Sequence, residues 1–588
     1  PYLHDVVIQL KMLFYSLYFL YNIADRSDYN MEYILGIDTG GTYTDAVVIC
    51  ENNNQIVSKA KVFTTHDDLS EGIRSCIEQM NFCDIKKIKE IHLSTTIVVN
   101  KILEGEFQSI GILQVGKCTD GKLPGKYSYN ISIPGSCSKG LTDRSLCNMD
   151  EIKKVFAGNV EAIIVSAAPS KYSRDSEGFV SKIVEEELGI KCISASDMCD
   201  LDDRYDRLIT AAFTTFLRPV VKKFIQSIKS VAIEFGITDR IFIVNALGKL
   251  ISCDEAVTDP LKTVFSGLAA SVNGGVALTK EKDFLLLDMG GTSSDVTRII
   301  DSSFREFKGV AKIGGYRVKE KTMNIKSYGV GGDSYIRLTQ CKDIEVGPQR
   351  AIPLCVAADL FPHLYNELLT YQKPKGYELL TSQEINCYIG VKGASLIGLD
   401  PMESLTARYL VNNPHNIFFI AEHFNKDADA LHMDRLIKQN AVRLISLTPT
   451  DILHAEGRFT KWNTGISVVA VKRMAAALNM EPEDFLTLAE EEIINALSKV
   501  CMQGIAAFED IEFDFDECQG ASFLLDSFFK DKNKLIKTDF SMSKPIVAVG
   551  APAGAWMDKV ATRLKTRAII PKHGEVANAF GAAIAEHD

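Results

Sequence analysis

Two short segments of the chain carry the same set of chemically useful residues. Residues 38–45 read Asp-Thr-Gly-Gly-Thr-Tyr-Thr-Asp, and residues 288–295 read Asp-Met-Gly-Gly-Thr-Ser-Ser-Asp. Both match the pattern Asp, any residue, Gly-Gly-Thr, any residue, a hydroxyl residue, Asp, and they lie 250 residues apart. A single Gly-Gly pair is typical of a plain hairpin, whereas two matched copies indicate a duplicated functional element.

These residue types suit the binding of phosphate and Mg²⁺. A Gly-Gly-Thr turn removes the side chains that would keep a phosphate away from the backbone, and it leaves N–H groups and a hydroxyl to hold the anion. An Asp at a strand end can bind Mg²⁺, usually through water. We therefore predict nucleotide binding and Mg²⁺ ligation by Asp38 and Asp288, with phosphate contacts from Gly40, Gly41, Thr42, Gly290, Gly291 and Thr292.

Apolar runs flank both segments and predict the elements that position them. Tyr33–Ile37 and Phe284–Leu287 precede the two turns, and Ala46–Ile49 and Val296–Ile300 follow them. The local prediction is a strand, a Gly-rich turn and a second strand, twice. Two such turns, one in each half of a duplicated protein, indicate a nucleotide clamped between two domains.

Composition limits the class of protein. A chain of 588 residues, 46% hydrophobic and 24% charged, is long enough for two to four domains of an ordinary globular protein. The net charge of −11 gives no support to nucleic-acid binding. Its 14 cysteines include no CxxC pair and its ten histidines no HExxH motif, so we expect reduced thiols in a cytoplasmic protein rather than a zinc or disulfide scaffold.

The first thirty residues differ from the rest. Val6–Ile23 is apolar and aromatic but contains Lys11 and is short for a membrane span. A basic start and a cleavage site, which a signal peptide needs, are missing. We expect residues 1–30 to lie outside the fold, with Met31 as the natural start; a membrane anchor is the open alternative.

Other motifs add to the predicted nucleotide site. Ile91–Asn100 reads as a strand that ends in Ser-Thr-Thr and opens a helix, so Thr95 and Thr96 either face a cleft or cap the helix, and both interpretations stay open. A third Gly-rich loop contains Gly331 and Gly332. The strand 546–549 runs into Gly550 and Ala551, a turn on which an adenine or ribose can pack.

Several helices are predicted around these motifs. Small residues fill the helices at 264–275 and 574–584, which suits a hinge, although the first could equally be a well-packed helix. A long helix is predicted over Arg204–Phe235, where Pro219 could introduce a kink. Thr448–Asp451 opens a helix that contains His454, and as a capped helix start it needs no function.

In its order of motifs the chain resembles the superfamily of actin, the sugar kinases and the heat-shock ATPase chaperones. Within that superfamily it is similar to the hydantoinase/oxoprolinase family, of the A-subunit type. The resemblance covers about residues 31–588 and is carried by residues 36–45, 93–96, 100, 266–267, 269–270, 288–292, 331–334 and 346–348.

This resemblance implies a fold and its division into domains. The fold class would be α/β, with two ribonuclease-H-like (actin-like ATPase) domains, a nucleotide cleft between them, and insertions. The expected parts are a first domain at 31–260 on the substrate side, a hinge helix at 261–280, a second domain at 281–572 with an insertion at about 355–540, and a C-terminal hinge helix at 573–588.

The resemblance also implies an activity. ATP with Mg²⁺ would phosphorylate a cyclic amide, imide or carbonyl substrate, with Asp38 and Asp288 as catalytic residues and Thr95, Thr96 and Asn100 on the substrate. A B-type partner subunit and an oligomer are expected. The alternative is a nucleotide-driven activator or chaperone-like ATPase that acts on a partner protein; a sugar kinase is a third reading that the substrate regions do not favour.

Three segments depart from the family pattern. Leu268 stands where the family usually has Pro, residues 245–249 replace a Gly-rich segment, and residues 134–138 correspond only loosely to a Gly-Gly-His stretch. We therefore expect the nucleotide side of the site to follow the family, and the substrate to differ from the family's known ones.

Overall fold

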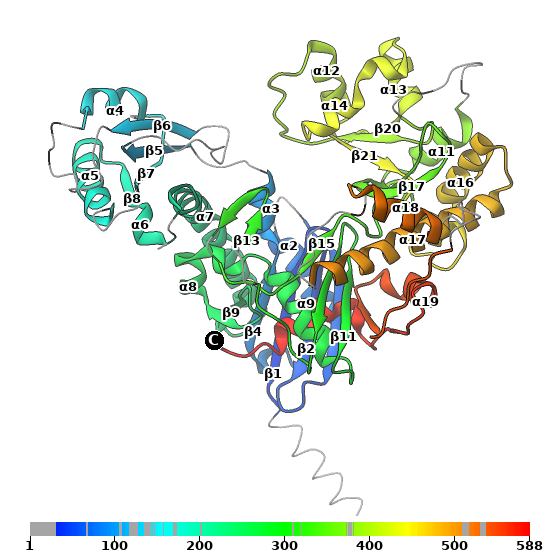
Figure 1. The fold of residues 1–588 in the computed structure, drawn as a ribbon, viewed down its shortest axis with the longest axis horizontal. Helices are drawn as coiled ribbons and strands as arrows, with labels where there is room; N and C mark the ends of the chain where they lie inside the picture. Colours follow the sequence, from blue (N-terminus) through cyan, green and yellow to red (C-terminus); the bar gives the residue numbers. More distant parts are fainter. Residues whose placement is uncertain are drawn as a thin grey trace, which may run out of the picture. The chain divides into compact units, whose positions relative to one another are not determined.

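The structure is a computed structural model (Figure 1), and it divides into two compact units. The first unit comprises the described residues up to Ala277, Arg305–Asn324 and Val576–Asp588; the second comprises Leu278–Phe304 and Ile325–Glu575. The described residues are 31–65, 69–104, 109–116, 128–133, 143, 145, 147–156, 158–168, 173–199, 201, 203–307, 311–318, 320–371, 373, 379, 382–508, 515, 517–529 and 537–588. The segments predicted to be an extension, residues 1–30, and a substrate loop, 134–138, lie outside them.

A six-stranded sheet forms the centre of the first unit, in the order β10-β9-β4-β1-β2-β3. The β1–β2 hairpin and β3 are antiparallel, whereas β4 and β9 run parallel to β1. Its strands are β1 Tyr33–Thr39, β2 Tyr43–Cys50, β3 Ile56–Phe63, β4 Ile88–Thr95, β9 Ile241–Val244 and β10 Leu250–Ser252. The helices of this part are α2 Leu69–Met80, α3 Ile97–Glu104, α7 Arg204–Phe235, α8 Cys253–Thr258, α9 Ser266–Ala277 and α20 Ala577–Ala583.

The second unit repeats this arrangement. Its sheet has the order β15-β12-β11-β22-β23, in which β11, β12 and β15 are antiparallel neighbours and β22 and β23 run parallel to β11. The strands are β11 Phe284–Met289, β12 Ser294–Ile299, β15 Lys326–Tyr328, β22 Ile546–Val549 and β23 Ala568–Ile569. Five strands in the same order, with the same pairing directions, therefore occur once in each unit.

A second sheet is inserted into the first unit between α3 and α7. Its four parallel strands have the order β6-β5-β7-β8 (Figure 1). They are β5 Ile110–Val115, β6 Ser128–Ile133, β7 Ala162–Ala167 and β8 Lys191–Ser194, with helices α4 Met149–Phe156, α5 Ser173–Leu188 and α6 Ala195–Met198. No motif described above indicated this sheet.

The second unit also carries an insertion with a sheet of its own, in the order β18-β21-β19-β20. These strands are β18 Ile352–Pro353, β19 Cys387–Gly390, β20 His415–Asn416 and β21 Val442–Ser446. The helices of the unit are α10 Leu354–Leu360, α11 His363–Thr370, α12 Pro401–Tyr409, α13 Ile417–Phe424, α14 Met433–Lys438, α15 Pro449–Ala455, α16 Thr464–Leu478, α17 Pro482–Phe508, α18 Gln519–Phe529 and α19 Ala553–Arg563.

Two antiparallel hairpins complete the strands, β13 Ala311–Ile313 with β14 Tyr316–Val318 and β16 Ser334–Leu338 with β17 Ile344–Arg350. The helix predicted over Arg204–Phe235 is confirmed as α7 and continues through Pro219. The Asp203 side chain caps its start, and Gly236 ends it at φ 66°, a conformation that glycine adopts without strain.

The two helices of small residues pack closely against one another in the first unit. A Cβ on Gly581 of α20 would lie 1.7 Å from the Ala270 carbonyl oxygen of α9, and one on Gly274 would lie 2.0 Å from the Ala577 oxygen. No side chain larger than hydrogen fits at these crossings. This contact agrees with the alternative prediction for α9, that it is a well-packed helix. Its role as a hinge stays a prediction.

The core of the second unit contains Trp556 on α19, which is fully buried. The Arg458 guanidinium lies over its ring, 4.9 Å from the centroid. The second tryptophan of the chain, Trp462, belongs to the same unit and stacks on His454 with ring centroids 5.4 Å apart. The Thr448 side chain caps α15 as predicted. His454 lies on this capped helix, and its position there needs no functional explanation.

None of the described helices is long and apolar enough to cross a membrane.

Candidate functional site

The two Gly-Gly-Thr segments form hairpins of the same register. Asp38 lies opposite Asp45 in the β1–β2 pair, and Asp288 lies opposite Asp295 in the β11–β12 pair. Within the turns, the Gly40 N–H donates to the Tyr43 carbonyl at 3.0 Å, and the Gly290 N–H donates to the Ser293 carbonyl at 2.9 Å. The duplication that the sequence shows is thus a duplication of backbone geometry, with an Asp at each end of the turn.

The Asp38 carboxylate is buried and held by two neighbouring elements. Its Oδ1 accepts a hydrogen bond from the Ser94 hydroxyl of β4 at 2.6 Å, and its Oδ2 accepts one from Asn578 Nδ2 at 3.4 Å. A Cβ on Gly267 of α9 would lie 3.3 Å from Oδ1. Strand β4 and both small-residue helices therefore fix this carboxylate in one orientation.

Thr95 lies beside the first turn, and its hydroxyl makes hydrogen bonds within the protein. It is buried, and its Oγ1 accepts from the Thr39 hydroxyl at 2.8 Å and from the Ile97 N–H at 3.1 Å. The second contact caps the start of α3. The capping alternative for Thr95 therefore has a contact in the structure, and its predicted contact with a substrate stays a prediction.

Thr96 and Asn100 are more exposed and lie at the same turn. Asn100 Nδ2 donates to Thr96 Oγ1 at 3.2 Å, and it would be 3.7 Å from a Cβ on Gly41. Both side chains are half-buried. They lie next to Gly40 and Gly41, and their predicted contact with a substrate stays a prediction.

In the second unit the loop of Gly331 and Gly332 packs directly onto the second turn. The Gly332 N–H donates to the Gly290 carbonyl at 3.1 Å, and the Asp333 N–H donates to the Gly291 carbonyl at 2.6 Å. A Cβ on Gly331 would lie 2.6 Å from the Gly291 oxygen, so the backbone itself is the packing surface.

Gly550 closes the second turn from the other side. Its φ of 90° is a conformation that favours glycine, and a Cβ would lie 2.2 Å from the Met289 oxygen and 2.9 Å from Asp288 Oδ1. Ala551 follows on the surface. Three predicted ligand-binding segments, separated by long stretches of sequence, therefore meet around Asp288.

The two turns differ in charge. Asp45, behind the first, forms an ion pair with Lys61 at 2.7 Å. Burial and the nearby charge of Asp288 raise the pKa of Asp295 to about 7, and its Oδ1 is buried with no hydrogen-bond partner in the described structure. The second turn thus has two adjacent carboxylates and an unsatisfied oxygen where the first has a lysine.

This arrangement fits a divalent cation at the second turn. Mg²⁺ prefers carboxylate oxygens and usually keeps several waters, so Asp288 with the neighbouring Asp295 supplies a suitable donor set. Asp38 was predicted as a ligand equally, and that role stays a prediction; its carboxylate accepts hydrogen bonds from Ser94 and Asn578.

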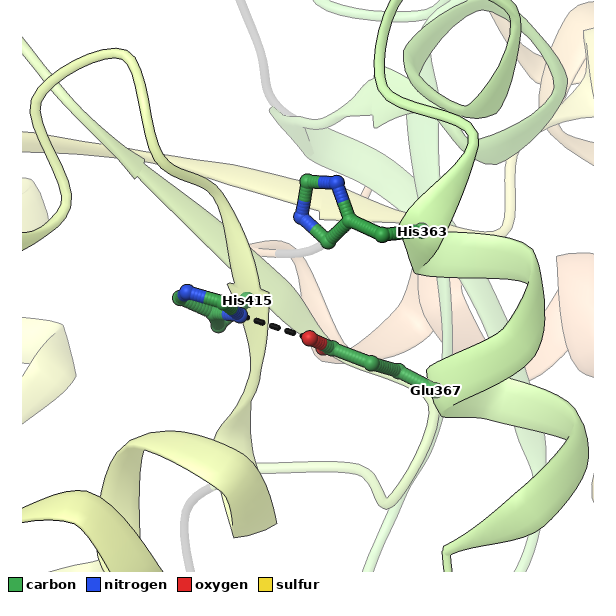
Figure 2. Close-up of side chains that lie close together, drawn as sticks. All are labelled: His363, Glu367 and His415. Carbon is green, nitrogen blue, oxygen red and sulfur yellow. Dashed lines mark hydrogen bonds and ion pairs between the residues drawn. The ribbon is translucent and has the colours of Figure 1, made fainter.

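One group of residues that could bind a metal was not predicted from the sequence. His363, Glu367 and His415, all in the second unit, lie together in the insertion (Figure 2). His363 and Glu367 are four residues apart on α11, which was a readable signal, but His415 is 48 residues beyond Glu367. The sequence contains no HExxH or CxxC pattern that would have predicted a metal site here.

The geometry defines a mixed α/β protein with two matched sheets, each with a Gly-Gly-Thr turn. Two family models match: the hydantoinase/oxoprolinase N-terminal region at residues 34–132 and hydantoinase/oxoprolinase at residues 207–354. These matches identify both regions as hydantoinase/oxoprolinase domains, as their motifs had indicated.

The curated relatives have low sequence identity to this chain and are longer than it. The chain is 24% identical over 365 residues to the acetophenone carboxylase gamma subunit of Aromatoleum aromaticum, covering 54% of this chain and 49% of that one. It is 22% identical over 359 residues to the caprolactamase subunit alpha of Pseudomonas jessenii, covering 54% and 51%. The chain thus spans about half the length of these relatives.

Solved structures support the fold over most of the chain. The nucleotide-free structure of acetone carboxylase matches with a TM-score of 0.62 and 16% identity, covering 94% of this chain and 70% of that one. The ATP-dependent caprolactamase of Pseudomonas jessenii matches with a TM-score of 0.57 and 18% identity, with the same coverage. At these identities the likeness concerns the fold.

Proposed function

We propose that the protein is an ATP-dependent enzyme of the hydantoinase/oxoprolinase type, to which each unit contributes one phosphate-binding turn. The observation that carries the proposal is the pair of hairpins with the same register, each in a sheet of the same strand order. That order, with three antiparallel strands followed by two parallel ones, also supports a ribonuclease-H-like fold for both sheets, as in the actin-like ATPases.

The residues of the two turns have separate roles in this proposal. Bound ATP supplies a phosphoryl group that converts a carbonyl oxygen into a better leaving group. The backbone N–H groups around Gly40, Gly41, Gly290 and Gly291 and the hydroxyls of Thr42 and Thr292 would hold the phosphates. Asp288 would hold Mg²⁺, and Asp38, fixed by Ser94, would orient the attacking group.

The proposed substrate is a cyclic amide or imide, contacted by Thr96 and Asn100. The chain is similar to a caprolactamase, whose name states that it acts on a cyclic amide, and this similarity supports an amide substrate. The acetophenone and acetone carboxylases support a second candidate, in which the chain is the nucleotide-binding subunit of a ketone carboxylase. Both chemistries begin by activating a carbonyl oxygen, so the same turns serve either.

A partner subunit is part of the proposal. Both curated relatives are named as subunits. We therefore propose a B-type partner that completes the reaction, within an oligomer. The cytoplasmic location expected from the sequence is part of the proposal.

ATP hydrolysis by the purified chain, with and without the products of neighbouring genes, tests the proposal. Lactams, hydantoins and 5-oxoproline should each be compared with ketones plus bicarbonate. Stimulation by a cyclic amide supports the hydrolase, and stimulation by a ketone with bicarbonate supports the carboxylase subunit. Stimulation by a protein partner alone would support the nucleotide-driven activator and overturn both enzymes.

A further inference from the structure

The insertion of the second unit contains a group of side chains that the proposed ATP chemistry does not use. His363 and Glu367 lie on the same face of α11, since residues four apart on a helix are neighbours. His415 belongs to β20 and projects toward them (Figure 2). One potential ligand atom from each residue lies within 4.8 Å of the other two.

We propose that His363, Glu367 and His415 bind a zinc-type divalent ion that joins α11 to β20. Two imidazoles and one carboxylate are the donor set of a common class of three-ligand zinc site, in which water or a substrate takes the fourth position. Imidazole donors favour zinc and the neighbouring transition metals over Mg²⁺ or Ca²⁺, which prefer oxygen. The site is separate in its chemistry from the carboxylates of the phosphate turns.

The carboxylate is held in place by the protein. Glu367 is buried; its Oε2 accepts the Asn416 N–H at 2.9 Å, while its Oε1 meets His415 Nδ1 at 2.6 Å. The Asn416 side chain in turn donates to the backbone carbonyls of Glu384 and Asn386. One oxygen is thus anchored and the other faces the two histidines, as a metal-binding carboxylate requires.

Both imidazoles have contacts that orient them. His363 Nε2 contacts the Pro414 carbonyl at 2.7 Å, and the His415 ring stacks on Tyr409 with an interplanar angle of 13°. Their ring centroids lie 5.4 Å apart. Contacts of this kind orient metal-binding histidines. The Pro414 carbonyl only accepts, so His363 Nε2 carries the proton and Nδ1 is left as the acceptor, whereas His415 would move its proton from Nδ1 to Nε2 to bind an ion through Nδ1.

The adjustments needed for an ion are small. Around a tetrahedral ion with bonds of about 2.0–2.2 Å, ligand atoms lie about 3.3 Å apart. The His415–Glu367 contact at 2.6 Å must therefore open slightly, and the wider separations, up to 4.8 Å, must close. Rotation of the half-buried His363 and His415 side chains supplies movements of this size without displacing the backbone.

A simpler account is that His415 and Glu367 form only a structural ion pair. That pair does not involve His363, which distinguishes the two accounts. The decisive variant is consequently His363→Ala, because it removes one proposed ligand and leaves the His415–Glu367 bond intact. Glu367→Gln is the second variant, and it keeps an acceptor for the Asn416 N–H.

Zinc binding to the chelator-treated full chain tests the site, measured by competition with a chromophoric chelator. We expect one tight zinc per chain, weakened at least tenfold in His363→Ala and in Glu367→Gln. The matched control is His423→Ala, which removes a histidine that also stacks on Tyr409 but is not one of the three proposed ligands. Its affinity should equal that of the unaltered protein.

A cobalt spectrum separates this site from the cysteines. Co²⁺ bound by two histidines and a carboxylate should show d–d bands without sulfur-to-cobalt charge transfer. Unaltered zinc affinity in a folded His363→Ala chain, or a charge-transfer band from thiolate ligands, would overturn the proposal. Circular dichroism of the metal-free variants shows that they are folded and makes each outcome decisive.

Discussion

The carboxylates of the two turns have the same positions but different electrostatic surroundings. Lys61 neutralises Asp45, whereas Asp295 is half-buried next to Asp288, and its buried Oδ1 has no hydrogen-bond partner in the described structure. A buried carboxylate oxygen without a partner lowers the stability of the folded state, and binding a proton or a cation usually offsets that loss. The asymmetry is the main reason for assigning the ion to Asp288 rather than to Asp38.

Asp288→Ala tests that assignment. We expect the ATPase rate to fall at least a hundredfold, because the variant loses the proposed Mg²⁺ ligand while the surrounding strand keeps its register. The control Asp283→Asn alters an exposed Asp near the start of the same strand, paired with Lys544, and should leave the rate unchanged. Normal turnover in a folded Asp288→Ala chain would contradict the assignment.

Gly291→Ala tests the packing of the turn. The new Cβ would lie 2.6 Å from Asp333 Oδ2, so either that side chain or the turn must move. We expect the Kd for ATP, measured by titration with a fluorescent analogue, to rise at least tenfold, or about 1.4 kcal/mol. Gly520→Ala is the control, since nothing lies within 4 Å of its Cβ.

Asp333 gives a pH-dependent prediction. Burial raises its pKa to about 6 from the ordinary 3.8, although Arg350, 4.0 Å away, opposes the shift. Between pH 3.8 and 6, Asp333 is protonated in the folded protein and ionised in the unfolded chain. This contribution to stability is therefore present below pH 3.8 and lost as the pH rises through 6.

Asp333→Asn should remove that dependence. Relative to the unaltered protein, its free energy of unfolding should rise as the pH increases from 3.8 to about 6 and then level off, with a total gain of about 3 kcal/mol. Melting curves at several pH values measure the difference. A difference that does not change with pH would show that the carboxyl titrates normally.

At the scale of elements, α9 and α20 meet without room for a methyl group. Gly581→Ala would place a Cβ 1.7 Å from the Ala270 oxygen, so the helices must separate. We expect a loss of about 3 kcal/mol or more in the stability of the first unit, seen as a lower melting temperature by circular dichroism.

The matched control is Gly178→Ala in α5, where nothing lies within 4 Å of the new Cβ. There the substitution should stabilise the helix by up to about 1 kcal/mol, because alanine is the better helix former. Equal melting temperatures for the Gly581 and Gly178 variants would contradict the close packing of α9 and α20.

The elements show why the sequence revealed some features and concealed others. The hairpins could be predicted because each lies within a few residues and occurs twice. The parallel sheet of β5, β6, β7 and β8 could not, since its pairing is set by contacts across crossover segments. The contacts of Thr95 were likewise unresolved, because capping and ligand binding require the same residue type at the same strand end.

At the scale of the whole molecule, the duplicated strand order is the result that no single motif contained. The sequence indicated two equivalent turns, and the structure shows that each lies in the same position of an equivalent sheet. The His363, Glu367 and His415 cluster lay beyond prediction for the opposite reason. Its members come from two elements 48 residues apart and have no counterpart elsewhere in the motif pattern.

The distribution of aromatic chromophores has a practical consequence for optical measurements. Both tryptophans, Trp462 and Trp556, belong to the second unit, and Trp556 is fully buried. Intrinsic tryptophan emission is therefore a built-in probe of that unit alone. A change that loosens α9 from α20 should alter the far-ultraviolet signal and leave the indole emission of the second unit as it was.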